Sequence, residues 1–172
     1  MNRRQFLRTA AFTPLVVVLG SKFVATLRHY PLTDLQQRLR AMQPDRLRSM
    51  GNWNVSQIFQ HCAQNLRYSI VGYPQHHSVL QKNIVGKLAL NFYAAIGSMP
   101  AAQEQPIPGA PPLAADVPND VALNELMFEL QEFINWQGEL AAHFAYGSLT
   151  KAQYYKVHAL FLEQQLQQIV SR

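Results

Sequence analysis

Residues 54–70 read NVSQIFQHCAQNLRYSI, and this stretch decides the fold class. Asn54 is a favoured N-terminal helix cap, and the apolar residues that follow it recur every three or four positions. At roughly 100° per residue they form a stripe about a third of the helix circumference wide. The stripe consists of Val55, Ile58, Phe59, Cys62, Leu66 and Ile70. The segment therefore predicts a helix that turns one face toward a protein core.

Helical periodicity recurs on both sides of this segment, and no stretch of convincing length alternates as a strand would. We expect helices from Thr33, in a capping box with Gln36, to the residues before Pro44; from Ser78 to Gly97; from Asn119 or Asp120 to Tyr146; and from Thr150 to the C-terminus. The predicted fold is all-α, with four main helices in a bundle and one long crossover.

The predicted crossover is the connection at residues 99–119, which contains six prolines. Neither a helix nor a central strand can run through so many prolines. A loop of this length in a small domain is usually either a lid over a site or a spacer. Glu104 and Asp116 are its few reactive side chains, which favours the spacer.

The N-terminus has the features of an export signal. Arg3 and Arg4, followed by Phe6 and Leu7, resemble the twin-arginine motif, and the apolar run at residues 10–20 is shorter than the roughly 20 residues that span a bilayer. We interpret residues 1–25 as this signal and residues 26–172 as a single domain. The expected location is the periplasm or the exterior, with the signal either cleaved or retained as an anchor.

Charge and cysteine content exclude several classes of function. The chain has 15 Lys and Arg, four of them in the first 25 residues, so the remaining 11 nearly balance the 10 Asp and Glu. A domain this close to neutral gives weak support to nucleic-acid binding. We expect its one local cluster of cations to be a solvated helix flank; the cluster consists of Arg38, Arg40, Arg46 and Arg48. Cys62 is the only cysteine, which excludes an internal disulfide and a cysteine-rich zinc site. Its place on the apolar stripe predicts an inert core residue.

Two blocks of sequence carry a resemblance to a known superfamily. Trp53 and His61 are spaced as at the entry to the second helix of DinB-like proteins. Residues 143–158, HFAYGSLTKAQYYKVH, are similar to the turn and final-helix start of an uncharacterised exported branch of that superfamily. The matching positions there are His143, Gly147, Leu149 and Thr150. The chain therefore resembles the DinB-like four-helix bundles over about residues 33–170.

The resemblance implies a divalent metal, zinc or nickel, held by the histidine of the second helix and by an H-x-x-x-H pair on the last. Phe161 and Gln165 occupy the positions of that pair. A phenyl ring cannot coordinate a metal, and an amide oxygen ligates weakly. We therefore expect a degenerate site with no metal, no other cofactor and no catalytic residue. A rebuilt metal site of His61, His143 and His158 is the alternative.

These observations leave two functional hypotheses. The leading one is a non-catalytic exported domain that binds a ligand or a partner. Besides the twin-arginine translocation machinery, its expected partners are a small molecule or a second copy in a homodimer, and not nucleic acid. The alternative is a metal- or thiol-dependent transferase that uses the rebuilt histidine site.

Overall fold

The computed structural model describes residues 32–78, 86–99 and 104–171. The predicted signal sequence, including Arg3 and Arg4, lies outside the described residues. Within the described part of the chain, no helix has both the length and the apolar character needed to cross a membrane.

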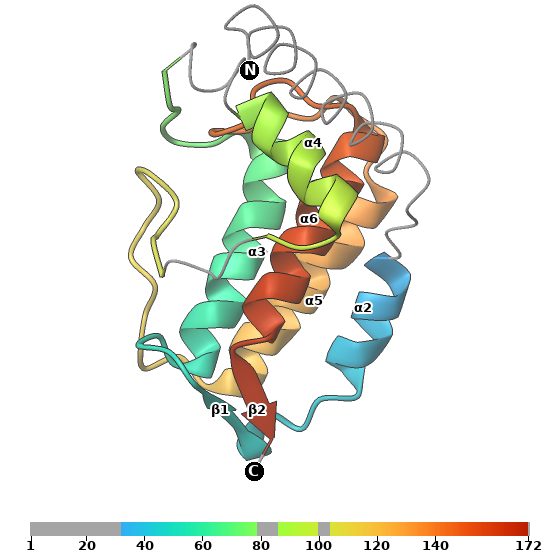
Figure 1. Ribbon diagram of the computed structural model, residues 1–172. Helices are drawn as coiled ribbons and strands as arrows, with labels where there is room; N and C mark the ends of the chain where they lie inside the picture. The colour runs from blue at the N-terminus through green and yellow to red at the C-terminus, as the bar shows by residue number, and fades with distance from the viewer. Residues whose placement is uncertain (1–31, 79–85, 100–103, 172) are drawn as a thin grey trace, which may run out of the picture.

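The described chain is mainly helical, which confirms the predicted all-α class (Figure 1). Its α-helices are α2 (Leu32–Arg40), α3 (Val55–Val71), α4 (Lys87–Ile96), α5 (Asn119–Asn135) and α6 (Lys151–Leu166). Helices α3, α5 and α6 run side by side, α2 packs on α5 and α6, and α4 lies across α6. One apolar core is enclosed by α2, α3, α5 and α6.

Helix α3 forms as its sequence predicts. The side chain of Asn54 accepts a hydrogen bond from the N–H of Gln57 at 2.8 Å, and the Gln57 side chain accepts from the N–H of Asn54 at 3.0 Å. This reciprocal capping box satisfies two backbone donors that the first turn leaves open. The apolar stripe is buried, apart from the half-buried Ile70. Gly72, with a φ of 102°, ends the helix.

The predicted start of the first helix is wrong. Helix α2 includes Leu32, so Thr33 lies within its first turn and does not cap it. Gln36 does not reach back to Thr33. Its side-chain nitrogen donates instead to the side-chain oxygen of Gln131 on α5 at 2.7 Å. Gln36 therefore links α2 to α5, next to the buried Leu35 and Leu39.

Helix α5 ends at Asn135, and the predicted end at Tyr146 is wrong. Trp136 leaves the helical conformation with a ψ of 128°, and its indole N–H donates to the backbone oxygen of Glu139 at 3.1 Å. The ammonium group of Lys151 donates to the carbonyl oxygens of Ile134 and Trp136. Since a cation satisfies these last carbonyls, the helix stops here and residues 136–150 are free to form a loop.

Helix α6 begins as predicted and ends earlier than predicted. Thr150 and Gln153 form its capping box, but the helix stops at Leu166 instead of continuing to the C-terminus. The following strand β2 (Ile169–Ser171) pairs antiparallel with β1 (Leu47–Ser49), which follows the short 3₁₀ helix η1 (Pro44–Arg46). Strands of three residues are too short to show alternation in a sequence, so this pairing was not predictable from periodicity.

The crossover loop is fastened to α3 by glutamine side chains. Gln60 makes two hydrogen bonds with Ala114, donating to its carbonyl oxygen at 2.8 Å and accepting from its N–H at 3.0 Å. Gln57 and Gln64, one turn away in either direction, donate to further carbonyl groups of the loop. These bonds satisfy backbone groups of a segment that has no helix or strand of its own, and they fix its path along α3.

Gly86, just before α4, lies against the 136–150 loop. A Cβ atom at this position would come within 2.1 Å of the carbonyl oxygen of Ala145. In an ordinary helix the change Gly→Ala stabilises by about 1 kcal/mol. Because the neighbour here is backbone, we expect Gly86→Ala to destabilise instead, by about 1–3 kcal/mol, in urea unfolding. As a control, Ala89→Gly on the same helix should lower the free energy of unfolding by the ordinary Gly/Ala difference. A Gly86→Ala variant that is more stable than the unmodified protein would contradict the close contact.

Candidate functional site

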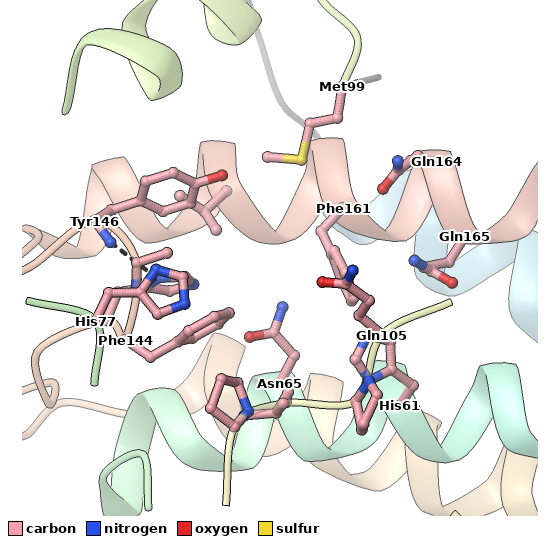
Figure 2. Close-up of a pocket in the computed structure, with 16 residues that line it drawn as sticks. His61, Asn65, His77, Met99, Gln105, Phe144, Tyr146, Phe161, Gln164 and Gln165 are labelled. Carbon is pink, nitrogen blue, oxygen red and sulfur yellow. Dashed lines mark hydrogen bonds between the residues drawn. The ribbon is translucent and has the colours of Figure 1, made fainter. Parts of the chain in front are cut away.

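A cavity of about 230 Å³ lies between α3, α6, the 136–150 loop and the crossover loop (Figure 2). The described residues that line it are His61, Asn65, His77, Met99, Gln105, Pro106, Ile107, Pro108, His143, Phe144, Ala145, Tyr146, Val157, Phe161, Gln164 and Gln165. None of them is Asp, Glu, Lys or Arg. The crossover loop supplies one wall at residues 105–108, so it does more than the spacer that its sequence suggested.

The two ends of the cavity differ in chemistry. Figure 2 shows the aromatic rings of Phe144 and Tyr146 at one end and the amide groups of Gln164 and Gln165 at the other. The amide of Asn65 lies between them, with its nitrogen directed into the cavity. A molecule with an apolar body and polar atoms would find a matching surface along this length.

The aromatic end is built on a tight turn around His143. Backbone hydrogen bonds of 2.9 and 3.0 Å join His143 and Gly147, and the imidazole stacks on Phe144 and Tyr146 with ring centroids 4.6 Å apart in each case. The Nδ1 atom of His143 accepts from the N–H groups of Ala145 at 3.1 Å and Tyr146 at 3.3 Å. Burial holds the pKa of His143 well below its usual value. The ring is therefore neutral, with its proton on Nε2.

His61 is packed between aromatic rings. Its ring centroid lies 5.0 Å from that of Trp53 and 5.2 Å from that of Phe161, both in edge-on geometry. Burial lowers the pKa of His61 to about 4, so the ring is neutral at physiological pH. Within the described residues its Nδ1 atom has no hydrogen-bond partner. The structure thus brings His61 together with both predicted degenerate positions, because Phe161 touches it and the buried Gln165 lines the same cavity.

His158 does not belong to this cavity. Its ring is fully buried, with its centroid 4.5 Å from that of Phe133 and 5.3 Å from that of Tyr154. Burial lowers its pKa to about 3, and neither ring nitrogen has a hydrogen-bond partner in the described structure. No group of three or more His, Cys, Asp and Glu side chains among the described residues is arranged to hold a metal. The rebuilt set of His61, His143 and His158 is therefore not assembled there.

Asn65 of the cavity wall, and Tyr73, which binds its side chain, were not predicted from the sequence. Asn65 lies one turn after His61 on α3, and its side-chain oxygen accepts from the hydroxyl group of Tyr73 at 2.7 Å. Burial raises the pKa of Tyr73 well above its usual value, so this hydroxyl stays protonated. The spacing of four from His61 to Asn65 was the available signal, since it places both side chains on one helix face.

One other expectation concerns the cysteine. Cys62 is buried in the core, and burial raises the pKa of its thiol, as expected for an inert packing residue.

The adjacent His76 and His77 are both exposed, and His77 also lines the cavity.

The comparisons with known proteins place the chain in one family. No curated protein and no solved structure matched it. A family model described as "Protein of unknown function (DUF1569)" matches residues 24–172, which is most of the chain and includes every residue of the cavity. The chain therefore belongs to the DUF1569 family.

Proposed function

We propose that this protein is an exported, non-catalytic helical domain that binds a small uncharged molecule in the cavity. The observation that carries the proposal is the lining, in which no described residue is Asp, Glu, Lys or Arg. Burial keeps His61 and His143 neutral, and it raises the pKa of Tyr146 to about 12, so this hydroxyl stays protonated. The other described lining residues are apolar or amide-bearing, apart from the exposed His77. A charged ligand would lose its hydration there without gaining a counter-ion, which is costly. An uncharged ligand with an apolar body incurs no such cost.

We also propose that the scaffold is a DinB-like four-helix bundle with a degenerate metal end. Helices α2, α3, α5 and α6 share one core, in keeping with such a bundle. The proposal is further supported by the contact between Phe161 and His61, since these two positions would hold neighbouring metal ligands in that superfamily. In this chain an aromatic ring fills the space that a metal would need.

Export by the twin-arginine pathway remains part of the proposal. It is supported by the paired Arg3 and Arg4 and by the family match, which begins only at residue 24. The proposed location is therefore the periplasm or the exterior, with the translocation machinery as a transient partner.

The alternative is a metal- or thiol-dependent transferase that uses His61, His143 and His158. It draws no support from the described arrangement, because His158 lies outside the cavity. In addition, Nδ1 of His143 already accepts two backbone hydrogen bonds, which puts the proton on Nε2, where a ligand to a metal would need a lone pair.

The binding proposal is tested with three probes that share one ring and differ in charge: benzyl alcohol, benzoate and benzylamine. In NMR titrations of the ¹⁵N-labelled protein at pH 7, we expect saturable shifts at Tyr146 and Val157 with benzyl alcohol only. Ala145→Trp places a large ring in the cavity wall and should abolish them. Ser148→Trp, in the same loop but outside the lining, is the matched control and should keep them.

Two results would contradict the proposal. One is tighter binding of benzoate or benzylamine than of benzyl alcohol, which would reveal a charged site. The other is that benzyl alcohol shows no saturable binding, so that the unmodified protein and Ala145→Trp give the same changes in the spectrum.

A further inference from the structure

The inner wall of the cavity carries a hydrogen-bond donor, the side-chain amide nitrogen of Asn65. Asn65 is 3% exposed, and its side-chain oxygen accepts from Tyr73. Its side-chain nitrogen points into the cavity (Figure 2) and makes no hydrogen bond with the described residues. Asn65 therefore offers N–H groups, and not a carbonyl oxygen, to a molecule inside.

His143 has the same polarity. The two backbone N–H groups on its Nδ1 atom leave the proton on Nε2, so the free nitrogen of this ring is a donor. The backbone N–H groups of Ala145 and Tyr146 can only donate, so Nδ1 must be the ring nitrogen without a proton. The ring is 2% exposed and lines the cavity.

Tyr73 contacts both of these donor residues. Its hydroxyl group binds the side chain of Asn65, and its ring centroid lies 4.9 Å from that of His143. Both donors are thus supported by one buried aromatic residue, which keeps them oriented when the cavity is filled. No described lining residue adds a cationic side chain beside them.

We propose that the cavity selects molecules with an uncharged carbonyl oxygen, which accepts hydrogen bonds from Asn65 Nδ2 and His143 Nε2. This inference rests on the proposed function and specifies its ligand class. Ketones, amides and lactones with an apolar body fit both donors. Carboxylates are excluded, because a buried anion would need a positive charge that the described wall lacks.

The test compares acetophenone with α-methylstyrene, in which a CH₂ group replaces the carbonyl oxygen. The hydrocarbon is the more hydrophobic of the two, so without donors it would bind at least as tightly. We expect acetophenone to bind about tenfold more tightly in NMR titrations, as two neutral hydrogen bonds allow. In Asn65→Leu this preference should fall severalfold, whereas Asn135→Leu, which removes an exposed asparagine amide outside the cavity lining, should keep it.

A second measurement does not depend on any variant. In the imidazole ¹⁵N spectrum of the unmodified protein, His143 should be in the Nε2–H form, and its Nε2 signal should shift with acetophenone and stay in place with α-methylstyrene. Equal affinities for the two compounds, an Nδ1–H form of His143, or a preference lost in Asn135→Leu would overturn the inference while leaving the cavity as a binding site. If neither compound binds, the proposed function itself fails.

Discussion

Lowering the pH from 7 to 5 is expected to reduce the free energy of unfolding by about 4 kcal/mol through the buried His158 and His61, and His143 adds a loss in the same direction. Burial lowers the pKa of His158 to about 3 and that of His61 to about 4, and it holds the pKa of His143 well below 6.5. The unfolded chain regains the ordinary value of 6.5. Below that pH the unfolded state binds protons that the folded state does not bind, so stability falls as the pH falls.

The size of the effect follows from the width of this window. Each pH unit below 6.5 costs about 1.4 kcal/mol per histidine, so pH 5 costs about 2 kcal/mol for His158 and about 2 kcal/mol for His61. Proteins of this size are usually stable by about 5–15 kcal/mol, so this loss is a large share of the total. Urea unfolding at pH 7, 6 and 5 is the measurement, and the urea concentration at the midpoint should fall with each step.

A variant of His158 tests whether the buried histidines cause the loss of stability at low pH. In His158→Leu the unpartnered imidazole is replaced by an apolar group of similar size, so the variant should be more stable at pH 7 by about 1–2 kcal/mol. Its loss of stability between pH 7 and 5 should be about 2 kcal/mol smaller. Ile58→Val, a core change without a titratable group, should lose as much as the unmodified protein. A pH dependence unchanged in His158→Leu would contradict the assignment.

The double variant Phe161→His, Gln165→His is expected to gain zinc binding, which we propose the unmodified protein lacks. Positions 161 and 165 are one helical turn apart on α6, both line the cavity, and the ring of Phe161 lies 5.2 Å from that of His61. Three imidazoles would then converge on one space, as in common zinc sites. At a zinc concentration a hundred times the dissociation constant, binding should stabilise the fold by about 2.7 kcal/mol.

The melting temperature with and without zinc chloride measures this gain, together with metal analysis of the purified protein. Adding His61→Ala to the double variant should remove the zinc-dependent shift, and each single variant should show little of it. A folded double variant that does not respond to zinc would contradict the register of the DinB-like resemblance.

Much of the helical framework could be predicted because its signals are local. Asn54 and Thr150 cap their helices through side chains three residues away, and the apolar stripe of α3 has a period that the backbone geometry imposes. The placement of Phe161 and Gln165 beside His61 was also within reach, because it followed from a family resemblance with a known helix register.

The cavity itself was decided by contacts between distant segments. Helix α5 ends at Asn135 because Lys151, which follows it only after a loop, satisfies its last carbonyls, and that ending leaves His143 in a turn instead of a helix. His158 and His61 both lie on predicted helices, but the packing of the helices separates them. His158 lies against Phe133, whereas His61 lies against Phe161.

The sequence by itself determined where α3 and α6 begin, through Asn54 and Thr150, and which residues form the apolar face of α3. Only the tertiary structure decided that Asn65 and His143 present donors to a common space, that Gln36 joins α2 to α5, and that β1 pairs with β2. The physical reason is that capping and periodicity act over a few residues. A hydrogen-bond partner far along the chain is chosen only when the packed helices bring it within reach.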